Sequence, residues 1–570
     1  MRQLLFDQTA TAGGKHPLFL RPSLHLAFTL VAILLATPRA SGQMRKDDAP
    51  TRFIHAKLSI LPDSAQGEKV SGAALLKIPQ INSVDRDNTP LITADGNLLF
   101  FNSTRQGNRP WARLRTDKSR YDDDMYYVSR ASDSAGTEQW GNPVDFPSPI
   151  NTSEDDGVAA ISPTGETIFF LSLKKGWQND GGPFYGARLH GAEWSDIYGL
   201  GGGITKFFNQ KEGKTPIRIY GASVGASGKV FYFATTLHAS TSNHEIWVSQ
   251  LGDSGWSYPE NLGPVVNAGG GSYAPCIAAD GQTLYFASGR PGGLGGDDIY
   301  VTSYRDGGWE EPVNLGAPIN SSGHDAFLSL PASGDRAYFS SDRDGNDDIF
   351  EAPLARRFRP AGVLLFQGAV QARESGRPVE AVISVVDRES GATVFQANSN
   401  EVTGGFSVIL HPGHDYAVTL TAPGYVFMSD HFSVPASSQY RETTKIYAME
   451  RPEKDFNFSL NNVFFDNNEA TLTPESHGDL DRLALLLANH ERLRIRVIGY
   501  TDTVGSSIGN RMLSQRRAAA VKEYLTVSVG IDTARIEVVG EGAGHPVASN
   551  NTEEGRHQNR RVEFVVLNEE

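Results

Sequence analysis

The feature that most constrains the fold of this 570-residue chain is a repeat that runs from about residue 89 to residue 355. Each copy contains a strand-like run, a glycine turn, an aromatic strand-like run, a polar turn and a third strand-like run. The turn glycines follow one another at spacings of 69, 63, 53 and 53 residues: Gly96, Gly165, Gly228, Gly281 and Gly334. Such a period is typical of propeller blades, because one unit cannot bury its faces alone and stacked units leave few open sheet edges. We therefore expect residues 55–355 to form an all-β propeller.

The clearest copies lie at the end of this region. One of them carries strand-like runs at Leu284–Phe286 and Ile299–Val301, followed by a Trp-x-x-Pro-x-Asn-Leu segment from Trp309 to Leu315. Five copies are visible, and the pattern leaves open a sixth blade from residues 55–85 that uses strands from both ends. The pattern resembles the WD40-like (PD40) repeats of periplasmic proteins.

Two features inside the repeats have simple interpretations. The pairs Asp297-Asp298 and Asp347-Asp348 look like cation ligands, but each precedes an isoleucine and an aromatic residue at the same place in its copy. A turn element of the repeat is therefore favoured. The single cysteine, Cys276, lies in a strand-like run beside Ile277 and is expected to be buried and inert. One cysteine excludes an intrachain disulfide and a multi-cysteine zinc site, and we expect neither a metal nor a cofactor.

The N-terminus has the pattern of a secretory signal peptide over residues 1–42. Basic residues precede an apolar run from Leu24 to Thr37, and small residues follow up to Gly42. An uncleaved membrane anchor is the alternative, although a spanning helix needs about 20 apolar residues. The net charge of −14 and the pI near 5.5 argue against a nucleic-acid partner, because phosphates require a basic face.

A second β unit follows the repeats. Residues 356–362 (RRFRPAG) are predicted to be a linker, and residues 363–448 alternate strand-like runs with Gly and Pro turns. This pattern predicts a small antiparallel β-sandwich. It resembles the carboxypeptidase-regulatory-like fold, and a spacer or adhesion role is expected for it.

The last unit, residues 455–570, changes to an α/β pattern. A strand is predicted at Val463–Asp466, and a helix opens at Thr473-Pro474 with leucines on one face. Further strands are predicted at 494–498, 536–539 and 562–566. Strands separated by helices require a sheet that is covered on at least one face. The whole chain is thus expected to be multidomain.

One stretch of this last unit carries chemistry, from Gly499 to Val521. A turn that holds Asp502 precedes a predicted helix, whose N-cap is expected to be Asn510. The helix brings Arg517 toward the same side as the turn. An acid and a guanidinium that face one small site suit a ligand with both an ammonium and a carboxylate.

The stretch resembles the peptidoglycan-binding motif of the OmpA-like domain family, over about residues 455–567. The matching motif residues are Asn510, Leu513, Ser514, Arg517, Ala518 and Val521. The resemblance implies that Asp502 accepts from the ammonium of diaminopimelate and that Arg517 holds its carboxylate, both from exposed positions. It also implies pocket positions at the following residues: Thr501, Asn510, Asn468 and, more weakly, Asp466. Tyr500 is a departure, because the family usually has His there.

Three functional interpretations follow. The favoured one is a non-catalytic envelope protein, periplasmic and associated with the outer membrane, that binds peptidoglycan and tethers the membrane or a complex to the wall. A protein partner is then expected at the propeller. The second is a scaffold of a secretion or gliding machine, such as the type IX apparatus. The third is a propeller hydrolase, although the chain lacks a His-Glu-x-x-His motif.

Overall fold

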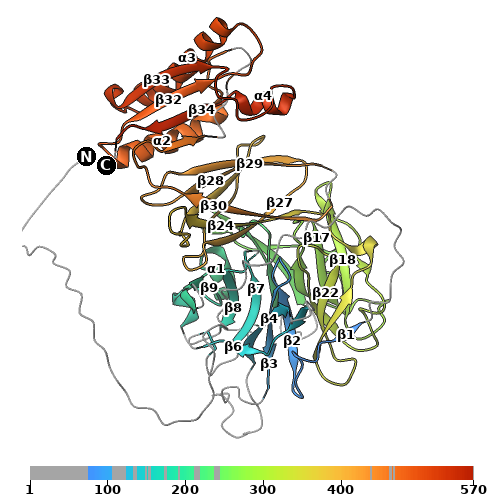
Figure 1. The fold of residues 1–570 in the computed structure, drawn as a ribbon. Helices are drawn as coiled ribbons and strands as arrows, with labels where there is room; N and C mark the ends of the chain where they lie inside the picture. The colour runs from blue at the N-terminus through green and yellow to red at the C-terminus, as the bar shows by residue number, and fades with distance from the viewer. Residues whose placement is uncertain are drawn as a thin grey trace, which may run out of the picture. The chain divides into compact units, whose positions relative to one another are not determined.

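The computed structural model describes residues 75–105, 123–132, 138–147, 150–151, 156–162, 164–172, 176–190, 193–210, 218–236, 244–436, 439–460, 465 and 469–568 (Figure 1). The signal-peptide segment, residues 1–42, lies outside the described residues, as does its membrane-anchor alternative. No helix in the described ranges combines the length and the apolar character needed to cross a membrane.

The described residues of the repeat region form five antiparallel sheets. The first has the order β2-β3-β4-β5 with β6 beside β4, and its strands are Asp87–Ile92, Leu98–Ser103, Asp124–Ser132, Glu138–Trp140 and Val144–Asp145. The second has the order β10-β9-β8-β7, with β7 at Asp156–Ile161, β8 at Thr167–Ser172, β9 at Phe184–His190 and β10 at Glu193–Gly199. Helix α1 (Gly202–Asn209) follows it, and Phe207 and Phe208 of this helix are buried.

The other three sheets follow in chain order. The third contains β11 to β15, at Ile219–Val224, Val230–Thr236, His244–Gly252, Gly255–Trp256 and Glu260–Asn261. The fourth contains β16 to β20, at Ser272–Ile277, Thr283–Ser288, Asp298–Arg305, Gly308–Trp309 and Val313–Asn314. The fifth has the order β1-β23-β22-β21, with β1 at Leu76–Lys77, β21 at Asp325–Ser329, β22 at Arg336–Ser341 and β23 at Asp348–Pro353.

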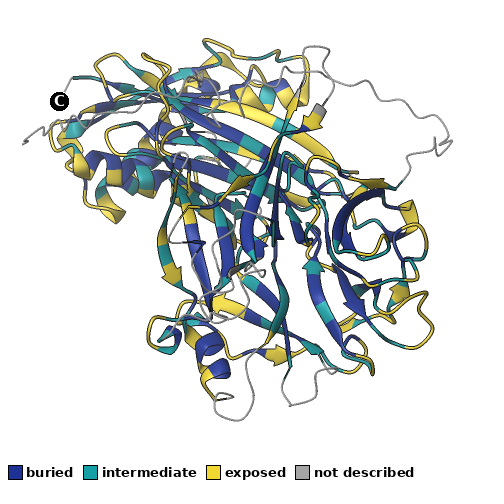
Figure 2. Cartoon of the chain, turned by 90° about the horizontal axis from the view of Figure 1, so that it is seen from below, coloured by how far each residue is buried: buried dark blue, intermediate teal, exposed yellow. Residues whose placement is uncertain are grey.

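The turn glycines lie where the repeat predicts them, between the first and second strands of each sheet. All five have a left-handed backbone, which glycine adopts without a Cβ penalty: Gly96 (φ 73°), Gly165 (75°), Gly228 (70°), Gly281 (68°) and Gly334 (61°). The strand runs predicted at 284–286 and 299–301 are confirmed as parts of β17 and β18. Figure 2 shows the strands mostly buried and the turns exposed.

The first strands of the five sheets contact one another in succession: β2 with β7, β7 with β11, β11 with β16, β16 with β21, and β21 with β2. Backbone hydrogen bonds also join neighbouring sheets. Asp325 N donates to Asp297 O at 2.8 Å, and Asp87 N donates to Asp347 O at 2.9 Å. The second of these bonds links the fifth sheet back to the first.

An asparagine motif reveals how the N-terminal segment is used. The Asn320 side chain bonds both backbone groups of Ile299, with Oδ1 accepting at 2.9 Å and Nδ2 donating at 2.9 Å. Asn82 does the same with Ile349, at 2.7 and 2.8 Å. Residues 76–82 therefore complete the fifth sheet, and β1 does not start a sixth sheet of its own. The corresponding sequence signal, which was not recognised, is an Ile-Asn or Val-Asn pair shortly before the first strand of a sheet, as at Ile319-Asn320 and Val266-Asn267.

We expect Asn82→Ala to destabilise the repeat region. The substitution leaves the backbone N–H and C=O of Ile349 without this partner, and one unsatisfied buried group costs about 1–3 kcal/mol. Asn320→Ala, which breaks the same pair of bonds within one copy, is the matched comparison. Thermal unfolding should show similar losses for both variants. If Asn82→Ala left the unfolding temperature unchanged while Asn320→Ala lowered it, the docking of the N-terminal segment would be contradicted.

The aspartate pairs divide into two roles. Asp298 and Asp348 start β18 and β23 and are only 1% exposed. Asp298 Oδ2 accepts from Leu294 N and from Asn314 Nδ2, as the turn interpretation requires. The preceding residues, Asp297 and Asp347, instead line a cavity that the sequence did not indicate.

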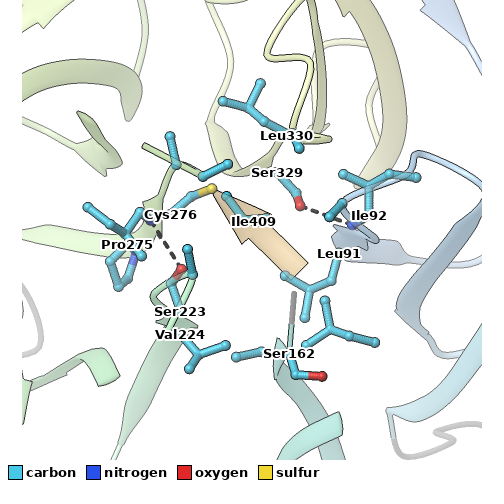
Figure 3. Close-up of a pocket in the computed structure, with 18 of the residues that line it drawn as sticks. Leu91, Ile92, Ser162, Ser223, Val224, Pro275, Cys276, Ser329, Leu330 and Ile409 are labelled. Atoms are coloured by element: carbon cyan, nitrogen blue, oxygen red, sulfur yellow. Dashed lines mark hydrogen bonds between the residues drawn. The ribbon is translucent and has the colours of Figure 1, made fainter. Parts of the chain in front are cut away.

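Cys276 lies on β16 among apolar side chains at a small cavity of about 80 Å³ (Figure 3). The same figure shows two hydrogen bonds that join neighbouring sheets, from Ile92 N to Ser329 Oγ at 3.0 Å and from Ile277 N to Ser223 Oγ at 3.1 Å. Cys276 itself is half-buried. Burial raises the pKa of its thiol to about 12, so the reactive thiolate is scarce at neutral pH.

The predicted linker is held against the fourth sheet at its start. Residues Arg356–Phe358 form a 3-10 turn, Phe358 is 8% exposed, and its carbonyl accepts from the Tyr285 hydroxyl. A buried aromatic anchor of this kind makes the beginning of residues 356–362 a poor protease site. The expectation of a plain linker is therefore wrong for these three residues.

Residues 364–449 contain two further sheets that share one apolar core. One sheet has the order β27-β24-β30, with strands at Gly405–Leu410, Leu364–Ala372 and Arg441–Met449. The other has the order β26-β25-β28-β29, with strands at Thr393–Asn398, Val382–Asp387, His414–Thr421 and Met428–Val434. The expectation of a purely antiparallel unit is wrong, because β24 and β30 pair in parallel.

The C-terminal unit is a four-stranded sheet with helices. Its strand order is β31-β34-β32-β33, at Asn457–Ser459, Val562–Val566, Ile495–Tyr500 and Ile536–Gly542, and its helices are α2 (His477–Asn489), α3 (Ser507–Glu523) and α4 (Glu553–Asn559). Ile495 and Val497 of β32 lie in a core with leucines of α2. Arg496, between them, forms a half-exposed 2.9 Å ion pair with Glu537 on the other face. The predicted strand at 463–466 lies outside the described residues apart from Phe465.

Candidate functional site

The site lies at the N-terminal end of α3. Ser506 is the N-cap, and its side chain accepts from Gly509 N at 3.1 Å. The prediction that Asn510 caps this helix is therefore wrong. Serine caps as well as asparagine does, and here it lies four residues earlier. Asn510 is instead buried in the first turn, where its Nδ2 donates to Asp502 O at 3.1 Å. It fixes the turn that carries the acid.

Two glycines let α3 lie directly on the sheet. A Cβ at Gly499 of β32 would lie 2.2 Å from the Ser514 carbonyl oxygen. A Cβ at Gly540 of β33 would lie 2.3 Å from Gln515 N. The close approach also allows the Ser514 hydroxyl to accept from Gly542 N at 2.9 Å. The helix that carries Arg517 is thus held at a fixed height above the strand that ends at the acidic turn.

Asp502 lies in that turn and is 9% exposed. Its Oδ1 accepts from Val504 N at 2.9 Å, a bond that stabilises the turn. Its Oδ2 forms a 2.8 Å ion pair with Arg560 Nη1. A carboxylate has about four lone-pair positions, so these two bonds leave room for further donors.

Arg517 projects from the middle of α3 and is 4% exposed. Its Nε donates to Glu469 O at 3.0 Å, and its guanidinium carbon lies 5.0 Å from the ring centre of Phe465. Burial lowers the pKa of Arg517, the charge of Arg560 lowers it further, and the charge of Asp502 opposes the change. The three charged groups therefore interact electrostatically. The expectation that Asp502 and Arg517 are exposed is wrong.

Arg560 is a charged partner of Asp502 that the sequence motif did not indicate. It follows α4 and bonds Asp502 with one nitrogen and Glu553 Oε1 with the other, at 3.0 Å. Burial acts to lower the pKa of Arg560, but the hydrogen bonds to Asp502 and Glu553 raise it above the ordinary value. The signal was the run Asn559-Arg560-Arg561, which directly precedes the strand predicted at 562–566 and found as β34.

Two neighbours complete the described part of the site. Thr501 is 5% exposed, and its Oγ1 has no hydrogen-bond partner among the described residues. Tyr500 is also 5% exposed; burial, followed by the charge of Glu563, raises the pKa of its phenol to about 12. Unlike the expected His, this side chain stays neutral at physiological pH. Two of the site residues predicted from the sequence, Asp466 and Asn468, lie outside the described residues.

The arrangement combines two guanidinium groups with one carboxylate in a largely buried setting. Arg560 pairs with the Asp502 carboxylate, and Arg517 interacts electrostatically with both groups. Such a site can hold a carboxylate through the guanidinium groups and accept an ammonium on the aspartate.

Comparisons with known proteins agree on this part of the chain. Residues 464–560 match the model of the OmpA family. The chain is 46% identical over 105 residues to Outer membrane protein A of Bordetella avium, a match that covers 18% of this chain and 54% of that protein. It is 43% identical over 104 residues to the peptidoglycan-binding protein ArfA of Mycobacterium tuberculosis, covering 18% of this chain and 32% of that protein.

Among solved structures, the peptidoglycan-associated lipoprotein from Burkholderia pseudomallei is 34% identical, with a TM-score of 0.18; the match covers 18% of this chain and 87% of that one. The chain spans about half or less of the length of the curated relatives it matches. The family match lies within the C-terminal unit, whose residues 464–560 are therefore similar to the OmpA family.

Proposed function

We propose that this chain is a non-catalytic cell-envelope protein that binds peptidoglycan through residues 455–570. One observation carries the proposal: the buried Asp502 and Arg517 interact with the half-buried Arg560 in a unit that matches the OmpA family. The name of the mycobacterial relative, a peptidoglycan-binding protein, supports the ligand. The name of the Bordetella relative, an outer membrane protein, supports a location in the envelope.

The proposed ligand group is the side-chain end of diaminopimelate, which bears an ammonium and a carboxylate. Asp502 accepts from the ammonium through the lone pairs that its two present bonds do not use. Arg517 and Arg560 attract the carboxylate. A guanidinium group can form two parallel hydrogen bonds to a carboxylate, which an ammonium group cannot do. Asn510 keeps the acidic turn in place, and Asn468, Asp466 and Thr501 remain proposed pocket residues.

The rest of the chain is proposed to tether the outer membrane, or a complex attached to it, to the wall. We assign residues 55–355 to one closed β-propeller with five blades, supported by the succession of contacts among the first strands and by the Asn82 link. Residues 363–448 are proposed to be a sandwich-like spacer. The protein would thereby connect the outer membrane, or a complex attached to it, to the wall.

A sacculus pull-down of the full chain tests the wall-binding proposal. Asp502→Asn should weaken binding at least about tenfold, because an amide does not replace a charge that pairs with an ammonium. Glu491→Gln, a change at an exposed residue of the same domain, is the matched control and should bind like the wild type. Equal retention of Asp502→Asn and wild type on sacculi would reject the site.

A further inference from the structure

A cavity of about 370 Å³ lies among the five sheets of the repeat region, and its lining includes none of the proposed wall-binding residues. Segments of all five sheets contribute to it, including the first strands and the residues just before them. We call this site the polar cavity. Its lining includes the following polar and charged side chains: Arg86, Tyr220, Tyr273, Asp297, His324 and Asp347. The cavity is distinct from the smaller apolar one at Cys276.

The backbone around the polar cavity is strained in a repeated way. The register of β2, β16 and β21 shifts at a bulge, and each bulge contains a non-glycine residue with a left-handed backbone. These residues are Thr89 (φ 53°), Ala274 (49°) and Phe327 (54°). Such conformations cost free energy for residues other than glycine, and bulges redirect the side chains beside them. Thr89 and Phe327 themselves line the cavity.

The charges of the cavity lining are predominantly negative. Asp297 Oδ2 forms a 2.8 Å hydrogen bond with His324 Nδ1, and Asp347 Oδ2 forms a 3.0 Å ion pair with Arg86. Asp123 is a third lining carboxylate. Even with His324 protonated, three carboxylates oppose two cations. A concave site with a surplus of one sign concentrates the field that attracts the opposite charge.

Aromatic rings are the second feature of the polar cavity that favours binding of a cation. Tyr273 donates its hydroxyl to Asp297 Oδ2 at 3.2 Å and packs edge-on against Phe327 and Tyr220, with ring centres 5.9 and 6.3 Å away. Burial, then the charge of Asp297, raises the pKa of Tyr273 well above its ordinary value, so the ring stays neutral. Carboxylates beside aromatic faces are the surroundings that ammonium and guanidinium groups prefer.

We propose that the polar cavity is a binding site for a lysine or arginine side chain presented by a protein partner. A side chain of this kind has an apolar stem for the aromatic rings and a charged end for Asp297 and Asp347. A metal ion fits less well, because the described residues contain no group of three or more His, Cys, Asp or Glu side chains arranged to hold one. A phosphate-bearing partner would meet a surplus of negative charge.

Selection from a display library of random dodecapeptides on the full wild-type chain tests this proposal. We expect the enriched peptides to share a lysine or arginine at a fixed position. A synthetic copy of an enriched peptide should lose at least about tenfold in affinity when that residue is replaced by glutamine. The same loss is expected for the double variant Asp297→Asn/Asp347→Asn, and higher salt should weaken binding.

Asp253→Asn, at an exposed turn of the third sheet, is the matched control and should bind the peptide like the wild type. Thermal unfolding checks the fold of each variant; if the double variant unfolds, Asp347→Asn alone replaces it, since that side chain is 35% exposed. Sacculus binding should be unchanged in these variants, which separates this site from the wall site. No enrichment, enriched peptides without a basic residue, or equal binding to the folded aspartate variants would overturn the proposal.

Discussion

Replacing Arg517 by alanine is expected to reduce peptidoglycan binding by at least about thirtyfold. Removal of one partner from a desolvated charge pair costs roughly 2–5 kcal/mol, and each 1.4 kcal/mol is a factor of ten in affinity. Arg517→Lys should also bind poorly, because an ammonium is a point charge and does not reproduce the planar fork of a guanidinium. Titration of the full chain with a diaminopimelate-containing peptide measures both effects.

The same change tests the burial of Arg517. Because the side chain is 4% exposed and bonds the Glu469 carbonyl, alanine should also lower the stability of the domain, by roughly 1–3 kcal/mol. The neighbouring Arg516 is exposed on the same helix, and Arg516→Ala should change neither stability nor binding. Circular dichroism during thermal unfolding measures the loss of stability in Arg517→Ala. Full wall binding by a folded Arg517→Ala protein would contradict the assignment.

The second large effect is expected for Gly540→Val. A side chain there would meet the backbone of α3, with its Cβ 2.3 Å from Gln515 N, and a backbone contact cannot be relieved by a rotamer change. Overpacking costs typically 1–3 kcal/mol and more where the backbone must move, so we expect a loss above about 3 kcal/mol. Chemical denaturation of the full chain should show early unfolding of the C-terminal unit.

Gly478 provides the matched control for this glycine change. It lies in α2, and a Cβ there would meet only Arg482 Nη1, at 3.4 Å. Gly478→Ala should be neutral or slightly stabilising, because alanine favours a helix over glycine. A Gly540→Val protein as stable as Gly478→Ala would show that α3 does not rest on β33 as described.

Local signals explain what the sequence predicted well. The turn glycines were identifiable because a left-handed backbone between two apolar runs selects glycine, and the strands beside them were predicted correctly as well. The role of Asn82 was missed because its partner, Ile349, lies far along the chain and the motif precedes the first recognised copy. The parallel pairing of β24 with β30 was missed for the same reason: no local pattern records which distant strand becomes a neighbour.

The candidate site was predictable in part. Asp502 and Arg517 were identified from their motif, and their electrostatic interaction agrees with the expected proximity. Arg560 was missed because it approaches from another element, 58 residues beyond its partner Asp502. Burial of Arg517 was not evident either, since a charged residue on a helix is usually exposed. Among the described residues, Phe465 and Glu469 contact this side chain.

The central claim is that the C-terminal domain recognises the zwitterionic end of diaminopimelate. Calorimetric titration of the full chain with two stem tripeptides, one ending in diaminopimelate and one in lysine, tests it most directly. The lysine peptide keeps the ammonium and lacks the carboxylate that Arg517 and Arg560 are proposed to hold. We predict that the diaminopimelate peptide binds at least about tenfold more tightly. Equal affinity for the two peptides, or no binding of the diaminopimelate peptide, would contradict the account.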